Sequence, residues 1–203
     1  MKIICIGRNY AKHAEELNNQ IPQEPVFFLK PDSSILQKNK PFYIPDFTNE
    51  VHYEVEVLFR INRLGKNIST KFAPRYYAEV GLGIDFTARD LQRNLKDKGL
   101  PWEKAKAFDS SAVLGTFIPI EEIEDVNNIE FSLVKNGEPV QEGNTSNMLF
   151  NIDQLVAHTS KYMTLKIGDI IFSGTPEGVG KVKIGDRLQG FIGEQMMFDF
   201  MVK

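Results

Sequence analysis

Three acidic residues carry the clearest chemical signal in this sequence. Glu54 and Glu56 lie in residues 51–59, an alternation of polar and apolar residues that predicts a β-strand with both carboxylates on one face. Asp85 lies in the apolar residues 80–86, where an unpaired ionised carboxylate is costly to bury. Carboxylates on one face repel each other unless a cation compensates them. Two glutamates and an aspartate from separate segments suit Mg²⁺, with positions left for water or substrate. A solvated strand face is the simpler interpretation of the two glutamates alone.

A histidine and a glutamate near the N-terminus form a second candidate. His13 and Glu16 are three residues apart in residues 11–17, whose composition predicts a helix, so their side chains can meet on one face. A carboxylate beside an imidazole fixes its tautomer and raises its basicity, as the activation of water requires. A solvated surface pair has the same spacing, and the spacing does not decide between these interpretations.

The glycine-rich residues 174–181 have the composition of a phosphate-binding loop but not its spacing. Val182 stands where such a loop needs Ser or Thr to hold Mg²⁺, so we reject a nucleotide site. We expect a tight loop whose backbone N–H groups, with the Thr175 hydroxyl, could bind a carboxylate. An ordinary turn is the alternative.

The predicted secondary structure is mostly strands with few helices. Apolar runs predict strands at residues 2–7 and 26–29, and the chain ends in a strand pattern over 195–202. One helical turn or more is expected over residues 73–79. Residues 151–162 have the apolar spacing of an amphipathic helix.

Asp85 is expected where a strand meets a helix. Residues 87–90 resemble a capping box, with Asp in place of the usual Glu, and predict a helix over residues 88–98. Gly99 is the expected stop. Side chains at such junctions are often functional.

Turn chemistry gives the firmest local predictions. Residues 130–141 predict a hairpin closed by a type I′ turn at Asn136-Gly137. The tripeptide Ile-Gly-Asp occurs at residues 167–169 and 184–186, each time before a strand pattern, and indicates similar turn chemistry used twice.

Length and composition favour a single globular domain, residues 1–203, that acts on small molecules. The sequence is 42% hydrophobic and 25% charged and has no linker-like stretch. Its net charge of -3 offers no basic stripe for nucleic acid and no polybasic patch for a membrane surface. The single cysteine, Cys5, excludes an internal disulfide and suits a reducing compartment. Without a signal peptide or membrane-span pattern, we expect a cytoplasmic protein.

Seven segments, taken together and in order, resemble the fumarylacetoacetate hydrolase family. They are residues 7–13 (GRNYAKH), 28–31 (FLKP), 53–56 (YEVE), 85–92 (DFTARDLQ), 136–138 (NGE), 143–146 (GNTS) and 174–180 (GTPEGVG). The resemblance covers nearly the whole chain. Residues 99–108 (GLPWEKAKAF) are most similar to the short acylpyruvase and oxaloacetate decarboxylase branch.

The resemblance implies a β-dominated α+β fold, a mixed β-strand roll with short helices, and a homodimer. It implies that Glu54, Glu56 and Asp85 hold Mg²⁺ or Mn²⁺. It also implies that Lys106 places a positive charge near the metal-bound substrate. Departures from the family pattern are Ala107, where many members have Ser, and Gly83-Ile84, where other branches have Ala-Asn.

The same resemblance assigns further site residues. His13 and Glu16 match a catalytic dyad on a segment, about residues 8–20, that closes as a lid. The remaining pocket residues, expected to bind substrate, are Arg8, Arg89, Gln92 and Thr175.

The implied activity is that of a Mg²⁺-dependent enzyme acting on small 2-oxo acids. A chelated 2-oxo acid would pass through a pyruvate enolate, stabilised by the metal and Lys106, when its C3–C4 bond breaks. Acylpyruvates would be hydrolysed by water that His13 and Glu16 activate. Oxaloacetate would lose CO₂ without an attacking water, and reprotonation of the enolate would give tautomerisation.

Two alternatives stay open at this point. One is an isomerase of unsaturated 2-oxo diacids in aromatic catabolism, similar to 2-hydroxyhepta-2,4-diene-1,7-dioate isomerase, which needs the same chelation but moves a proton. The other is a non-enzymatic, metal-dependent binding protein. The presence of His13, Glu16 and Lys106 beside the three acidic residues argues against the second.

Overall fold

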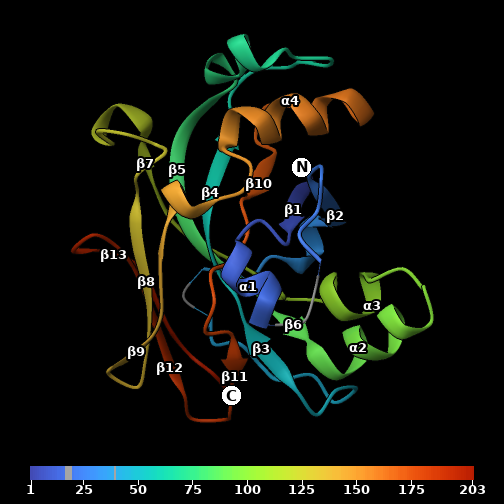
Figure 1. Ribbon diagram of the computed structural model, residues 1–203. Coiled ribbons are helices and arrows are strands. Elements are labelled where there is room, and N and C mark those ends of the chain that lie inside the picture. The colour runs from blue at the N-terminus through green and yellow to red at the C-terminus, as the bar shows by residue number, and fades with distance from the viewer. Residues whose placement is uncertain (17–19, 39) are drawn as a thin grey trace.

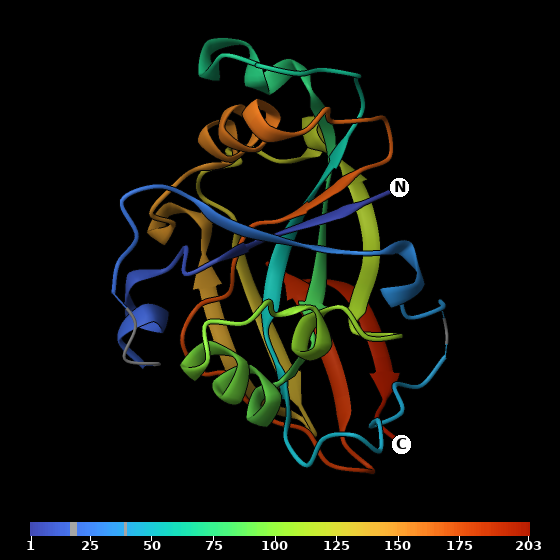
Figure 2. The same ribbon diagram turned by 90° about the vertical axis from the view of Figure 1, so that its right-hand side faces the viewer.

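The computed structural model describes residues 1–16, 20–38 and 40–203 and shows a β-dominated roll with short helices (Figures 1 and 2). Its largest sheet is mixed and has the order β2-β1-β10-β4-β5-β7, in which β1 runs parallel to β10. The strands of this sheet are β1 (Ile3–Gly7), β2 (Val26–Lys30), β4 (Val55–Ile61), β5 (Tyr77–Asp85), β7 (Ala112–Pro119) and β10 (Ile170–Phe172).

Two smaller sheets complete the roll. An antiparallel sheet of order β13-β12-β8-β9 consists of β8 (Glu130–Lys135), β9 (Glu138–Asn144), β12 (Arg187–Ile192) and β13 (Gln195–Met201). A small sheet of order β11-β3-β6 consists of β3 (Val51–Tyr53), β6 (Thr87–Ala88) and β11 (Gly180–Lys181).

The helices are short and lie outside the sheets. Figure 1 shows α2 and α3 together beside β6, with α4 at the other end of the molecule. The α-helices are α1 (Ala11–Glu16), α2 (Arg89–Asp97), α3 (Glu103–Lys106) and α4 (Ile152–Tyr162). The 3-10 helices are η1 (Asp32–Ser34), η2 (Thr70–Arg75), η3 (Ile120–Glu122) and η4 (Thr145–Asn147). Among the described residues, none of these helices has the length and apolar character that crossing a membrane requires.

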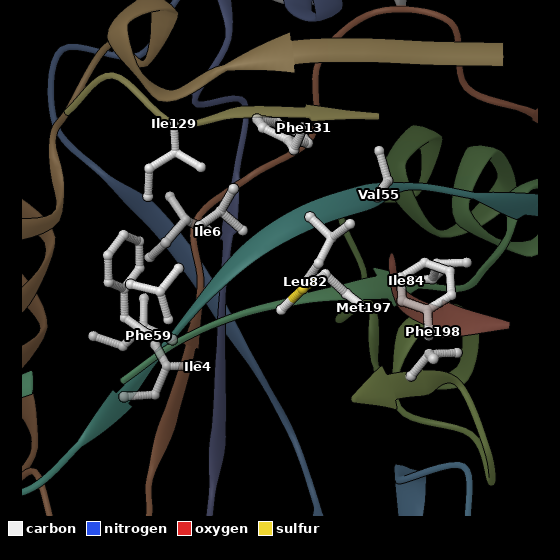
Figure 3. Packing of buried hydrophobic residues seen from close by; sticks show 14 of the residues in the cluster. Ile4, Ile6, Val55, Phe59, Leu82, Ile84, Ile129, Phe131, Met197 and Phe198 are labelled. Carbon is white, nitrogen blue, oxygen red and sulfur yellow. The ribbon is translucent and has the colours of Figure 1, made fainter. Parts of the chain in front are cut away.

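The main hydrophobic core lies between the large sheet and the four-stranded sheet. Figure 3 shows Leu82 of β5 close to Met197 of β13, and Ile84 of β5 close to Phe198. All four side chains are buried. Apolar residues on the inner faces of the sheets interdigitate in this way in packed β-structures. The core therefore fixes β5, the strand that ends at Asp85.

The alternating run at residues 51–59, predicted as one strand, is broken at Glu54. β3 ends at Tyr53 and pairs with β6 and β11, whereas β4 begins at Val55 and pairs with β10 and β5. The chain passes from one sheet to another at this residue. The Asp85 N–H donates to the Glu54 carbonyl oxygen at 2.9 Å, so the two acidic residues are adjacent across the strand ends.

The register of β4 against β5 sets the second glutamate. Glu56 lies opposite Gly83. A Cβ at Gly83 would come within 2.1 Å of the Val113 carbonyl oxygen, so only glycine allows β7 to lie this close. Gly83 is therefore a packing requirement of the strands that carry the acidic residues.

The predicted capping box before α2 is wrong. The helix begins at Arg89, its N-cap is Ala88, and no side chain caps it. Thr87 lies in β6, where its hydroxyl donates to the Asp85 carbonyl oxygen and accepts from Lys106 Nζ at 2.6 Å. The Thr87 hydroxyl oxygen, which a capping box would use, is therefore bonded to Lys106 instead. Gly99 is confirmed as the stop, with a φ of 63° and α2 ending just before it.

The other local predictions are largely confirmed. The hairpin of β8 and β9 turns at Asn136 and Gly137, both with positive φ, as a type I′ turn requires. Both Ile-Gly-Asp turns have glycine at positive φ, and in each the Asp carboxylate accepts from the N–H three residues earlier. The helix over 151–162 is present as α4, with Asn151 as its N-cap in a capping box.

One predicted helix differs from the structure, and another is described only in part. Residues 73–79 do not form one helical segment, because the 3-10 helix η2 ends at Arg75 and β5 begins at Tyr77. The helix predicted over 11–17 is described as far as Glu16. Leu17 lies outside the described residues.

Candidate active site

The three acidic residues predicted as metal ligands come together where β4 and β5 pair. One carboxylate oxygen from each of Glu54, Glu56 and Asp85 lies within 4.8 Å of the others, and all three residues are buried. Carboxylate oxygens this close can bind one cation, and they are the donors that Mg²⁺ and Mn²⁺ prefer.

Lys106, at the end of α3, holds two of these carboxylates. Its Nζ donates to Glu54 Oε2 at 2.6 Å and to Asp85 Oδ2 at 2.8 Å. The third hydrogen is donated to Thr87 Oγ1. Burial lowers the pKa of Lys106, but the charges of Asp85 and Glu54 more than offset this, so the pKa is raised. The side chain is therefore a cation inside the acidic cluster, as predicted from the resemblance.

Arg89 is the second cation that faces the cluster. Its Nη2 donates to Glu54 Oε1 at 2.5 Å, and its Nη1 donates to Gln92 Oε1 at 2.6 Å. Arg89 and Gln92 are three residues apart at the start of α2, so they share a helix face. The glutamine thereby orients the guanidinium toward the site.

Lys30 is a third cation, and the sequence reasoning gave it no role. It is fully buried at the end of β2, with its Nζ 2.7 Å from Asp85 Oδ1. A lysine within an apolar strand was the available signal, since a buried ammonium requires a charge partner. The partner itself is 55 positions away in the sequence, so no local pattern identifies it.

The two glutamates titrate in opposite directions. Burial raises the pKa of Glu54, but the Lys106 and Arg89 charges outweigh it and hold the pKa well below its usual range. Burial, followed by the charges of Asp85 and Glu54, raises the pKa of Glu56 well above its ordinary value. Glu56 is thus the carboxylate for which the protein supplies too little positive charge.

The chemistry of the site fits a hard divalent cation. Asp85 Oδ1 is buried and forms no well-aligned hydrogen bond in the described part of the chain, although Lys30 Nζ lies 2.7 Å from it. Together with the raised pKa of Glu56, this is the pattern expected where a cation would compensate carboxylates.

The glycine-rich loop binds carboxylates, and these belong to the protein itself. Gly174 N–H donates to Glu56 Oε2 at 2.7 Å, and Gly178 N–H donates to Glu16 Oε1 at 3.2 Å. Thr175 Oγ1 accepts from Gln141 Nε2 at 2.9 Å. The loop therefore orients one residue of the acidic cluster and one of the predicted dyad.

The predicted dyad is assembled on α1. His13 Nδ1 lies 3.3 Å from Glu16 Oε2, and His13 is buried. Burial lowers the pKa of His13, and the opposing effects of Glu54 and Glu16 do not reverse this. The imidazole is neutral at pH 7, with Nδ1 directed to Glu16 and Nε2 left as the second ring nitrogen.

A cavity of about 210 Å³ joins these groups. Every residue predicted for the site lines it, except Glu16, which lies behind His13. Arg8 is among the lining residues and has a φ of 60°, a left-handed backbone that is uncommon for a residue other than glycine. Lining residues that the sequence reasoning missed are Ile6, Gly7, Phe28, His52, Arg93, Lys96 and Trp102. Of these, His52 bonds through Nε2 to Glu50 Oε1 at 2.9 Å.

Comparison with known proteins identifies the family of this chain. The family model described as "Fumarylacetoacetate (FAA) hydrolase C-terminal" matches residues 2–197. The chain is 42% identical to a mitochondrial oxaloacetate tautomerase of Bos taurus, covering 99% of this chain and 91% of that protein. It is 43% identical to a mitochondrial oxaloacetate decarboxylase of Dictyostelium discoideum, covering 100% and 94%.

A solved structure shares both the fold and much of the sequence. The fumarylpyruvate hydrolase of Pseudomonas aeruginosa, crystallised with Mn²⁺ and pyruvate, superposes with a TM-score of 0.93 at 33% identity, covering 100% of this chain and 89% of that one. A family match over nearly the whole length, with relatives above 40% identity, is decisive. The chain belongs to the fumarylacetoacetate hydrolase family.

Proposed function

We propose that this protein is a divalent-metal enzyme that acts on small 2-oxo acids through a pyruvate-type enolate, with Mg²⁺ as the ion and Mn²⁺ as its substitute. The observation that carries the proposal is the cluster of three buried carboxylates within 4.8 Å, opening on a cavity that Lys106 and His13 also line. The names of the relatives, oxaloacetate tautomerase, oxaloacetate decarboxylase and fumarylpyruvate hydrolase, support this substrate class.

Glu54, Glu56 and Asp85 would hold the ion. An ion bound there would supply Lewis-acid chemistry, drawing electrons from a bound 2-oxo acid. Lys106 supplies a fixed positive charge beside the same carboxylates, where it can stabilise negative charge that develops on the substrate. Arg89, oriented by Gln92, and Thr175 face the cavity and would bind substrate oxygens, as would Arg8.

His13 and Glu16 would serve the hydrolytic reaction. Glu16 fixes the ring through Nδ1, so Nε2 can accept a proton from water as the water attacks C4 of an acylpyruvate. The depressed pKa of His13 keeps the ring neutral, which is the state that a general base requires. The proton can then be returned to C3 of the pyruvate product.

Oxaloacetate would need only part of this machinery. Its C4 is already a carboxylate, so loss of CO₂ requires no attacking water, and tautomerisation requires only removal and return of a proton. We therefore propose that one metal site supports hydrolysis, decarboxylation and tautomerisation, and that the group at C4 of the substrate determines which reaction occurs.

The test is a comparison of three substrates with one preparation. Purified protein, chelator-treated and then reloaded with Mg²⁺ or Mn²⁺, is assayed with oxaloacetate, an acylpyruvate and a 2-hydroxydienoate. Metal-dependent turnover of either of the first two is expected. Turnover of the dienoate alone would identify the isomerase alternative. Full activity of a Glu54→Gln, Glu56→Gln double variant after chelation would refute the metal site.

Three further predictions belong with this function. We propose that residues 1–203 act as one catalytic domain, that the segment at about residues 8–20 closes over the cavity as a lid, and that the protein is a homodimer. Sedimentation analysis tests the dimer, and protection of the lid segment from proteolysis by oxalate with Mn²⁺ tests closure. A small-molecule partner and a cytoplasmic location also stay predictions.

A further inference from the structure

Lys30 lies on the side of Asp85 that faces away from the cavity. The residue is 0% exposed and does not line the cavity, yet its Nζ is 2.7 Å from Asp85 Oδ1. A buried ammonium is costly and is rarely kept without a specific partner. The mechanism above does not use this cation, so its position requires a separate account.

The hydrogen bonds of Lys30 explain an apparent inconsistency at Asp85. Lys30 Nζ donates to the Ser111 carbonyl oxygen at 2.9 Å, to Ser111 Oγ at 2.9 Å and to the Phe86 carbonyl oxygen at 3.3 Å. An ammonium has three hydrogens, and these acceptors use all of them. Asp85 Oδ1, 2.7 Å from the same Nζ, mainly receives the charge of Lys30, because the other three oxygens are better aligned with its hydrogens.

Ser111 connects Lys30 to the other lysine of the site. Its Oγ accepts from Lys30 and donates to the Lys106 carbonyl oxygen at 2.8 Å, at the end of α3. Both lysines contact Asp85, Lys30 at Oδ1 and Lys106 at Oδ2. The two ammonium groups thus hold the carboxylate from opposite oxygens.

We infer that Lys30 is a positioning residue of the metal site. Its charge holds the Asp85 carboxylate in place at Oδ1, while Lys106 holds Oδ2. Through Ser111 it also fixes the backbone of Lys106. This inference rests on the proposed metal site, and it adds a function for a residue that does not line the cavity.

A positioning role for Lys30 and a purely electrostatic one predict opposite effects of its removal on metal affinity. If Lys30 acted only through its charge at a distance, it would repel a divalent cation, and its removal would tighten metal binding. If it positions Asp85, its removal leaves that carboxylate buried without its partner, and metal binding weakens. Loss of such an outer-shell partner typically costs about 10–100-fold in metal affinity.

The experiment measures binding of Mn²⁺ alone, from the electron paramagnetic resonance signal of free Mn²⁺, in folded protein. Lys30→Met removes the ammonium and is expected to weaken binding by about 10–100-fold. Lys2→Met is the matched control, since Lys2 Nζ also pairs with a buried aspartate, Asp169, and donates to a carbonyl oxygen, but far from the site. The control is expected to lose stability and keep the wild-type affinity.

The outcomes separate this inference from the proposed function. Absence of Mn²⁺ binding by the wild type would overturn the metal site and the inference together. Wild-type binding with equal or tighter binding by Lys30→Met would overturn the inference alone. If Lys30→Met does not fold, Ser111→Ala decides, because it removes the hydroxyl that holds Lys30 Nζ and links it to the Lys106 carbonyl oxygen. Weakened Mn²⁺ binding by this variant supports the inference, and wild-type affinity overturns it.

Discussion

Binding of a divalent cation should release about one proton, and Glu56 should be its source. Burial and the charges of Asp85 and Glu54 raise the pKa of Glu56 well above its ordinary value of 4.5. Glu54 already has a depressed pKa, and Lys106 has a raised one, so neither changes its charge near neutral pH. His13 has a lowered pKa and is already neutral there. Glu56 is therefore the group from which we expect the cation to displace a proton.

The size of the effect follows from that count. One proton released per cation makes metal affinity rise about tenfold, or about 1.4 kcal/mol, for each pH unit below the raised pKa of Glu56. Above that pKa the dependence should disappear. The pH also affects the free energy of unfolding. An acid whose pKa is raised by folding stabilises the folded state less as the pH rises, so the metal-free protein becomes less stable. The stabilisation that bound metal adds grows over the same range.

Calorimetry in buffers of different ionisation enthalpy, between about pH 5.5 and about pH 8.5, counts the protons directly. The variant Glu56→Gln serves as control, since it has no proton to release and should bind Mn²⁺ weakly and without this pH dependence. Tight binding of Mn²⁺ by the wild type, with no proton released and no change in affinity over the range, would refute the reasoning.

Three further predictions follow from single contacts. His13→Ala should reduce acylpyruvate hydrolysis by about 10²–10⁴-fold and spare oxaloacetate turnover, and equal loss of both activities would count against this role. In the wild type, kcat/KM for hydrolysis should fall only below pH 6.5, because burial lowers the pKa of His13. Gly174→Ala places a Cβ 2.8 Å from the Asn9 Cβ at a φ of 102°, so it should displace the N–H that holds Glu56 and weaken Mn²⁺ binding, and an unchanged affinity contradicts this. Asp169→Asn should lower the free energy of unfolding by about 3 kcal/mol, because it leaves the partly buried Lys2 without its charge partner. Urea denaturation measures this loss, and a value below about 1 kcal/mol would place the pair among weak surface ion pairs.

Local interactions explain what the sequence could predict. The turn at Asn136-Gly137 between the paired residues Lys135 and Glu138, the capped helix α4 and the two Ile-Gly-Asp turns involve contacts between residues no more than four apart, and all of them are present. Such contacts can be read from a short window of residues. The types and order of the acidic residues, with the family segments, likewise indicated candidate metal ligands before any fold was known.

Contacts between distant segments decided the rest. Only the pairing of β4 with β5 brings Glu54 next to Asp85, and only the tertiary packing takes the Thr87 oxygen away from the cap of α2. Gly174 meets Glu56 just beyond the pairing of β10 with β4, and Lys30 of β2 meets Asp85 of β5 although three strands lie between them in the order of the large sheet. The pKa of a buried carboxylate depends on all charges around it, whatever their distance in sequence. The sequence by itself therefore determined which groups could do chemistry, and the tertiary structure decided their charge, their partners and their separation.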